Sequence, residues 1–437
     1  SRNQRNYIKM LNGLKGRFRN QIRKHPHLRY YFKVAQRELL GTKCGNFYYH
    51  GVRKLLDNID FDSPPKKQER PQNSLIEITN ACNLNCLMCN TKLSNRPEGL
   101  MNPEVFERII VQLKSIGVPS AGLHTVGETF VYKDLESLFE IAKKHNFRVW
   151  VSTNAQFPKR IEPLFRKFPT TFSDLRISVD GATRKTFEHI RVGGSFDKVI
   201  ETLEVVHKLS AGKRGFRIGV TIDSVLNLET VREIPLYFET FGKYVFPEHI
   251  NFSVITGLSP DDKYFWSTFP FKHLIRSAVP CFMPFTNQYF TYDGKATMCC
   301  RDYNAEITAG DIMEKDAMEI WNGAKAETVR RQHLQPKTLE IEACKNCFTP
   351  YDFTTPITNK FIHFARIKLP ELSALDFANA VIALWEGMND ALEIRDVPKL
   401  KNSVIKTFQE VDSGRCPVPQ KNILESCTKA SSLPSPM

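Results

Sequence analysis

Three cysteines stand in C-x3-C-x2-C spacing in the stretch Cys82-Asn83-Leu84-Asn85-Cys86-Leu87-Met88-Cys89, directly after a short apolar run at residues 75–79. Thiolates are soft ligands that suit iron–sulfur clusters and zinc. A structural zinc site needs four ligands, and no fourth Cys or His lies nearby in the sequence. Three thiolates on a [4Fe–4S] cube leave one iron open for a reacting cofactor, whereas buried, inert cysteines are the alternative interpretation.

From about residue 72 the sequence alternates between strand-like and helix-like segments. The sequence Asn-Pro-Glu at residues 102–104 is a good helix start, because an N-cap residue is followed by Pro at the first helical position. Repeated βα units imply a parallel sheet with right-handed crossovers, and the cysteine triple would follow its first strand. We expect strands at residues 75–79, 121–124, 147–152, 175–179, 217–222 and 249–254, and helices at residues 103–116, 133–145, 159–167, 196–210 and 228–241.

The cysteine triple resembles the signature of the radical S-adenosylmethionine (radical SAM) superfamily. The resemblance implies a curved, partial (β/α)6 barrel with its chemistry at the C-terminal ends of the strands. It also implies that the open iron binds SAM, that an electron from the cluster cleaves SAM, and that a 5′-deoxyadenosyl radical then removes a substrate hydrogen atom. Met88 stands where the family usually has an aromatic residue before the third cysteine.

The loops after the next three expected strands resemble SAM-binding elements of the same family. The loop Val126-Gly127-Glu128-Thr129 keeps the second Gly and the Glu of the family's Gly-Gly-Glu-Pro loop. A carboxylate suits the SAM ammonium group, Gly lets backbone approach a ligand closely, and Arg suits a carboxylate. The resemblance implies that SAM is contacted by Gly127, Glu128, Asn154, Ser178, Asp180 and Arg191. His124 also lies at a strand end, where we expect a structural histidine rather than a base.

A second set of cysteines follows the expected barrel, and four thiolates could close a complete cluster there. Zinc is the competing metal for four cysteines. The surroundings resemble the SPASM/twitch extension of radical SAM enzymes, since Gly294-x4-Cys299 matches its G-x4-C element. No cysteine follows Cys347 until Cys416, which favours the shorter twitch version with one auxiliary [4Fe–4S] cluster. Cys300 could replace Cys299 or stay free. The expected ligands of this cluster are Cys281, Cys299, Cys344 and Cys347.

The net charge of +14 is concentrated near the N-terminus. Residues 1–56 hold 14 Lys or Arg and a single acid, Glu38, and therefore carry +13 of it. Such a segment would suit an anionic partner, and a helical cap with a solvated basic face is the alternative. No apolar run approaches the ~20 residues that span a bilayer, and no secretory signal is visible. Because several of the 11 cysteines suit metal ligation in a reducing compartment, we expect a cytoplasmic protein.

We expect an α/β chain with four parts. A basic helical N-terminal extension and linker would occupy residues 1–71, with Leu11, Leu14, Phe18 and Ile22 near helical spacing. The partial barrel would occupy residues 72–258, and a small α+β SPASM/twitch-like domain residues 259–356. Residues 357–437 would form a helical tail with a disordered end at 431–436, in which Cys416 and Cys427 are free thiols.

Three hypotheses for the function follow. The first is a radical SAM oxidoreductase with SAM and two [4Fe–4S] clusters, reduced by a donor such as flavodoxin or ferredoxin. It would oxidise a sugar or aminocyclitol-like substrate by two electrons with the auxiliary cluster as electron acceptor, although no side chain is assigned as the general base.

The second hypothesis is a ribosomal-peptide maturase that cross-links or epimerises its substrate and binds an acidic leader through the basic segment. Its candidate thiol hydrogen donors are Cys44, Cys300, Cys416 and Cys427.

The third hypothesis is a zinc protein that binds nucleic acid through the basic arm. It predicts strongly salt-dependent binding. It leaves the motifs at the strand ends unexplained, and we therefore do not favour it.

Overall fold

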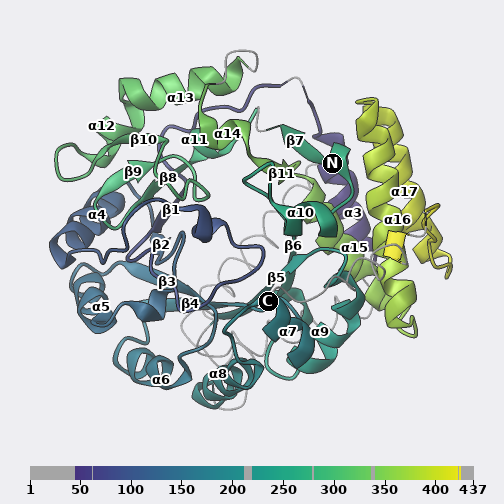
Figure 1. The fold of residues 1–437 in the computed structure, drawn as a ribbon, viewed down its shortest axis with the longest axis horizontal. Coiled ribbons are helices and arrows are strands. Elements are labelled where there is room, and N and C mark those ends of the chain that lie inside the picture. The colour runs from purple at the N-terminus through teal and green to yellow at the C-terminus, as the bar shows by residue number, and fades with distance from the viewer. Residues whose placement is uncertain are drawn as a thin grey trace, which may run out of the picture.

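The computed structural model describes residues 45–61, 63–210, 219–277, 280–335, 340–421 and 423–424. A curved sheet forms its centre and is seen end-on in Figure 1, with helices around the outside. The helices expected around Leu11, Leu14, Phe18 and Ile22 lie outside the described residues, as does the expected disordered end at 431–436.

Six parallel strands form the barrel sheet in chain order and confirm the expected βα units. The pairing register places Thr153 opposite Ile177 and Ile177 opposite Ile222. The first strand ends at Ile76, three residues before the expected end, and beyond it Thr79 pairs with Leu100 in an isolated antiparallel bridge. The strands are β1 (Asn73–Ile76), β2 (Ser120–Gly122), β3 (Arg148–Thr153), β4 (Phe172–Ser178), β5 (Gly219–Leu226) and β6 (Ile250–Val254).

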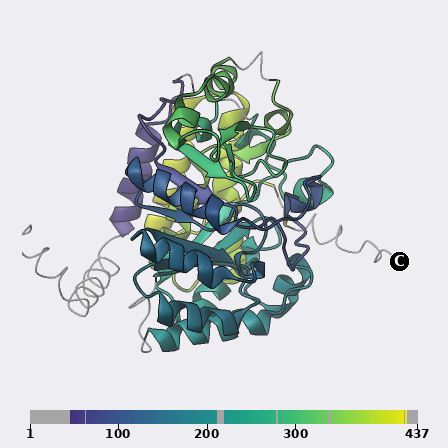
Figure 2. The same cartoon turned by 90° about the vertical axis from the view of Figure 1, so that its left-hand side faces the viewer.

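Amphipathic helices cover the outer face of this sheet, and Figure 2 shows those of residues 100–210 from the side. The first begins as expected, since the Asn102 side chain accepts a hydrogen bond from the Glu104 N–H and Pro103 occupies the first helical position. The short helix α7 was not expected from the sequence. The helices are α4 (Pro103–Ser115), α5 (Leu135–Lys144), α6 (Pro158–Lys167), α7 (Arg184–Ile190), α8 (Phe196–Leu209) and α9 (Ile234–Phe241).

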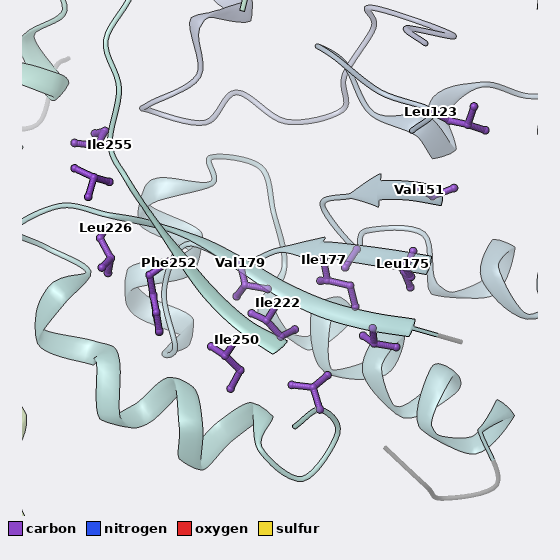
Figure 3. Packing of buried hydrophobic residues seen from close by; sticks show 14 of the residues in the cluster. Leu123, Val151, Leu175, Ile177, Val179, Ile222, Leu226, Ile250, Phe252 and Ile255 are labelled. Carbon is purple, nitrogen blue, oxygen red and sulfur yellow. The ribbon is translucent and has the colours of Figure 1, made fainter. Parts of the chain in front are cut away.

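The core lies between the strands and these helices. Alternate residues of β5 are buried, and Ile222 and Leu226 pack there with Ile177 and Phe252 of the neighbouring strands (Figure 3). Because side chains alternate across a strand, the other face of the sheet presents its residues to the barrel interior. Polar and small side chains such as Ser178 are found on that inner face.

The unit with the second cysteine set continues the barrel sheet, a feature that the sequence did not reveal. Strand β8 (Asn287–Phe290) pairs in parallel with β1, with Asn73 opposite Asn287, and the antiparallel strands β9 (Lys295–Thr297) and β10 (Thr308–Asp311) extend the sheet to nine strands. Two further strands, β7 (Ile275–Ser277) and β11 (Phe348–Pro350), pair separately. The helices of this region are α10 (Lys263–Thr268), α11 (Met283–Thr286), α12 (Ala317–Asn322), α13 (Ala324–Leu334) and α14 (Glu342–Lys345).

The opposite edge of the sheet, β6, is covered by helix α15 (Thr354–Lys368). The Asn359 side chain accepts a hydrogen bond from the Phe252 N–H at 2.8 Å and donates one to the Phe252 carbonyl oxygen. An exposed edge would offer such groups to another strand, so this contact ends the sheet at six barrel strands.

Helix α15 is packed in turn against α3 (Gly45–Asp57) and α16 (Ala374–Glu393), and α17 (Val397–Asp412) packs on α16. Helices α16 and α17 lie within residues 357–437, where a helical tail was expected. Within the described residues, no helix is both long and apolar enough to cross a membrane. Short 3-10 segments are η1 (Asn90–Leu93), η2 (Thr129–Val131), η3 (Val231–Glu233), η4 (Pro247–His249) and η5 (Lys272–Leu274).

Candidate active site

The cysteine triple lies on the loop that follows β1, and Cys82, Cys86 and Cys89 line one cavity of about 300 Å³. The cavity is at the C-terminal ends of the barrel strands, since Ser178 of β4 and Val225 of β5 also line it. All three cysteines are free thiols. The expected convergence of the triple with the strand ends is therefore present in the fold.

Helix α7 fixes the shape of this loop. The Asn85 N–H donates to the Val192 carbonyl oxygen at 3.0 Å, and the Leu87 N–H donates to the Ile190 carbonyl oxygen at 2.9 Å. Burial raises the pKa of the Cys86 thiol to about 12. A thiolate at this position therefore needs a positively charged partner or a metal to be stable.

Arg191, which ends α7, supplies positive charge beside the triple and also lines the cavity. Its charge lowers the pKa of Cys86, against the larger effect of burial. The guanidinium is held by Asp180, whose Oδ2 accepts from Nε at 2.8 Å and lies 2.6 Å from the other guanidinium nitrogen. Asp180 itself is buried and is not among the described residues that line the cavity. Asp180 thus positions Arg191, whereas the sequence suggested a direct contact with SAM.

Gly127 has φ +81°, and a Cβ at this position would lie 2.5 Å from the Thr79 carbonyl oxygen and 2.9 Å from that of Ala81. The next N–H, of Glu128, donates to the Ala81 carbonyl oxygen at 2.9 Å. The glycine is therefore required by close contact between the β2 loop and the loop of the triple. The sequence suggested that Gly127 lets the backbone approach a ligand. The contacts that a Cβ would make here are instead with the protein backbone.

The buried Glu128 carboxylate also lines the cavity and holds the loop after β3. Its Oε1 accepts from the Thr153 hydroxyl at 2.7 Å and the Phe130 N–H at 3.1 Å, and its Oε2 accepts from the Asn154 N–H at 2.7 Å. Burial raises the pKa of Glu128. A carboxylate offers about four acceptor positions, so Oε2 keeps one for an ammonium group.

Asn154 and Ser178 complete the cavity wall that the sequence suggested. The Asn154 amide donates to Asn83 Oδ1 at 2.9 Å and lies 4.0 Å from Cys82 Sγ. Three thiols on one loop, an adjacent guanidinium and a carboxylate with a spare acceptor position fit a [4Fe–4S] cluster with SAM on its open iron. Of the six residues suggested for SAM, the structure brings five to this cavity, and Asp180 is the exception.

The second cysteine set lines a separate and smaller cavity of about 30 Å³. Burial raises the pKa of the Cys281, Cys299 and Cys344 thiols. Cys300 lines the first cavity rather than this one, so the adjacent residues Cys299 and Cys300 belong to different cavities. The four thiols that line the second cavity are Cys281, Cys299, Cys344 and Cys347.

Two arginines lie beside these thiols. Arg276 donates to Cys281 Sγ at 3.3 Å and pairs with Asp352 at 3.0 Å. Arg301 donates to the Thr349 hydroxyl at 2.5 Å, and the neighbouring thiols raise its pKa. Four thiolates with two adjacent cations fit a fully ligated [4Fe–4S] cluster, because the cations offset its negative charge.

The two cavities share part of one wall, since Leu258 and Arg301 line both. The loop that carries Arg301 is held against the barrel by Arg96, whose Nε donates to the Tyr303 carbonyl oxygen at 2.9 Å. Arg96 also pairs at 2.8 Å with the buried carboxylate of Glu77, at the end of the first strand segment. The sequence did not reveal Glu77 or Arg96, because their significance depends on contacts between distant segments.

His124 also lines the first cavity. Its ring lies edge-on to Trp150 with 5.0 Å between centroids, and within the described part of the chain no hydrogen bond to its nitrogens is found. Burial, and then the charge of Arg176, lower its pKa to about 4. The sequence suggested a structural histidine here, and the structure places this residue on the wall of the cavity.

The comparisons with known proteins agree with this site. Residues 76–234 match the Radical SAM superfamily, and residues 281–348 match SPASM, an iron-sulfur cluster-binding domain. The mycofactocin maturase MftC of Mycobacterium tuberculosis is 34% identical over 148 residues, which are 33% of this chain and 36% of that protein. The match therefore spans only about a third of the length of that relative.

Two further similarities extend over more of the chain. The S-adenosyl-L-methionine-dependent 2-deoxy-scyllo-inosamine dehydrogenase of Niallia circulans is 20% identical over 276 residues, 62% of this chain and 90% of that protein. The solved structure of native anSMEcpe with bound AdoMet aligns at 17% identity with a TM-score of 0.46, covering 71% of this chain and 100% of that one.

Proposed function

This chain belongs to the radical SAM superfamily and carries a C-terminal iron–sulfur cluster-binding domain, and we propose that it oxidises a small sugar or aminocyclitol-like alcohol by two electrons. SAM and two [4Fe–4S] clusters are its cofactors. When bound, SAM and its cluster supply the removal of a hydrogen atom from a substrate C–H bond. The protein supplies binding, orientation and the exclusion of water around that chemistry.

The first cavity is the proposed site of the reaction. Cys82, Cys86 and Cys89 would hold the cluster, and Arg191 would compensate its charge. Glu128 would accept from the SAM ammonium group. The proposed SAM-binding residues are Gly127, Glu128, Asn154, Ser178 and Arg191, and Asp180 acts through Arg191.

The shared wall is the observation that carries the proposal of an oxidation. Because Leu258 and Arg301 line both cavities, the proposed sites of the substrate and of the auxiliary cluster adjoin each other. That cluster, held by Cys281, Cys299, Cys344 and Cys347, has no open iron for a substrate. It can therefore serve as the acceptor of one electron, with a one-electron carrier such as a flavodoxin or ferredoxin as the external partner.

The size of the first cavity supports a small substrate. About 300 Å³ is near the lower end of the roughly 300–1,000 Å³ of small-molecule sites, and both the cluster and SAM have to share this space. The similarity to an aminocyclitol dehydrogenase over 90% of that protein's length supports the same substrate class.

Peptide maturation is the second candidate, supported by the similarity to mycofactocin maturase. A peptide could present one side chain to the cavity. Of the candidate thiol donors, Cys300 lines the cavity, whereas Cys416 donates to the Asp376 carbonyl oxygen on α16. Cys44 and Cys427 lie outside the described residues.

The experiment is anaerobic turnover of the reconstituted protein with SAM, a reductant and 2-deoxy-scyllo-inosamine as the probe, within a panel of polyols and aminocyclitols. We expect ketone and 5′-deoxyadenosine in equimolar amounts. The variant Cys347→Ala should form less ketone per 5′-deoxyadenosine, because the proposed electron acceptor is disrupted. Formation of 5′-deoxyadenosine with an epimer, or with no oxidised product across the panel, would contradict the proposal.

A further inference from the structure

The proposed oxidation requires a group that accepts the hydroxyl proton of the alcohol, and the residues lining the first cavity narrow the choice. Arg191 and Arg301 are cations and cannot accept a proton. The three cysteines of the triple are committed to the cluster. The remaining ionisable residues that line the cavity are His124, Glu128, Cys300 and Tyr303.

Three of these four are poorly suited to take a proton. Glu128 already accepts from three protein donors and faces the proposed SAM ammonium group. The Cys300 thiol interacts with the Tyr289 hydroxyl. Tyr303 carries its own proton, and burial followed by the charge of Glu306 raises its pKa.

His124 is the ionisable residue that remains, and its position on the cavity and its neutral form fit the step. It follows β2 on the loop that leads to Gly127 and Glu128, and its ring is steadied by the edge-on contact with Trp150. Arg176 lies 4.1 Å from the Trp150 ring centre, on the next strand. Burial and this cation keep the imidazole neutral, since they lower its pKa to about 4. A neutral imidazole has one nitrogen with a free lone pair.

We propose that His124 is the catalytic residue that accepts the hydroxyl proton in the first cavity, an inference that rests on the proposed oxidation. The substrate loses its C–H hydrogen as an atom, its O–H proton to a ring nitrogen of His124, and one electron to the auxiliary cluster. The C–H and O–H bonds break and the C=O bond forms. The substrate therefore loses two hydrogens and two electrons in all, which balances an alcohol against a ketone.

Chemical modification tests the position of His124 without turnover. Diethyl pyrocarbonate should modify His124 in the folded protein at neutral pH, and added SAM should protect it, as read by mass spectrometry of peptides. His363 is the matched control, because its pKa is also lowered to about 4 but its ring is buried against Tyr48. Equal resistance of the two histidines to the reagent would overturn the proposal.

Turnover with 2-deoxy-scyllo-inosamine tests the role. For His124→Gln we expect ketone per 5′-deoxyadenosine to fall about 100-fold or more, as typical general bases contribute about 10²–10⁴-fold. Added imidazole should restore ketone to His124→Ala, a rescue that a merely structural role would not give, and iron content checks that each variant holds its clusters. His363→Gln should retain the wild-type ratio.

The outcomes separate this inference from the proposed function. If His124→Gln forms ketone at the wild-type ratio, the assignment of His124 is wrong and the oxidation stands. If the wild type forms 5′-deoxyadenosine but no ketone, the proposed oxidation is wrong, and the role of His124 as proton acceptor is wrong with it.

Discussion

The Arg191 guanidinium is held by Asp180 through Oδ2, at 2.8 Å from Nε and 2.6 Å from the second nitrogen, while Asp180 Oδ1 accepts from the Val225 N–H at 2.6 Å. The carboxylate is 1% exposed and the arginine side chain 11% exposed. This pair joins the end of β4, the end of α7 and strand β5 around the cysteine triple. Breaking this pair should therefore affect both the folding stability of the protein and the position of Arg191 in the first cavity.

Asp180→Asn should destabilise the protein by roughly 3 kcal/mol, because removing one partner leaves a buried cation without its charge partner. The variant should also bind SAM more weakly, since Arg191 is no longer held in place. Urea denaturation and SAM titration measure the two effects. Asp197→Asn breaks an exposed pair with Arg184 and should change neither; equal effects of the two substitutions would contradict this account.

Gly127→Ala should destabilise the protein more than Gly414→Ala, although both glycines have φ near +80°. A Cβ at Gly127 would collide with the carbonyl oxygens of Thr79 and Ala81, whereas at Gly414 nothing lies within 4 Å. Gly414→Ala should cost only the conformational strain of about 1–2 kcal/mol. Thermal unfolding compares the stability of the two variants. Similar losses of stability would show that the loop of Gly127 is not in close contact with the loop of the cysteine triple.

Cys299→Ser should lose the auxiliary cluster, whereas Cys300→Ser should keep it. The physical reason is that Cys299 lines the second cavity and Cys300 lines the first. Iron content and electron paramagnetic resonance of the reduced proteins distinguish the variants. The reverse pattern would assign Cys300 as the ligand.

His363→Gln should make folding stability less dependent on pH below neutrality. In the unfolded chain this histidine titrates near its ordinary pKa of 6.5, whereas burial and Arg366 lower its pKa in the folded protein to about 4. Between these values the unfolded state binds more protons, so stability is full above about pH 6.5 and falls as the pH drops toward 4, by roughly 3 kcal/mol in total. Urea midpoints at pH 7 and pH 4.5 measure the slope, and an identical slope in wild type and variant would contradict the burial of this ring.

The sequence was informative where function depends on local spacing. Three patterns lie within short segments of sequence, and the structure contains each of them. They are the cysteine triple, the C-x2-C pair at Cys344 and Cys347, and the alternation of strands and helices. Cofactor chemistry constrains ligand spacing, and helix and strand periods constrain apolar residues, so both leave readable patterns. The expected domain boundaries at residues 72, 259 and 357 stay predictions.

Contacts between distant segments were not readable in the same way. The pairing of β1 with β8 joins Asn73 to Asn287, and nothing local marks either as the partner of the other. The direction of a side chain at a strand end is equally hidden, which is why Asp180 was expected at the cavity and His124 was not. One residue of register moves a side chain from one face of a strand to the other.

The most direct test of the account is the iron and sulfide content per chain after anaerobic reconstitution of the wild type and of the variant Cys82→Ala/Cys86→Ala/Cys89→Ala. Two separate cubic clusters predict about eight irons in the wild type and about four in the variant. About four irons falling to none, with zinc bound in the variant, would make the second cysteine set structural and remove the proposed electron acceptor. Absence of iron from both proteins would contradict the whole assignment.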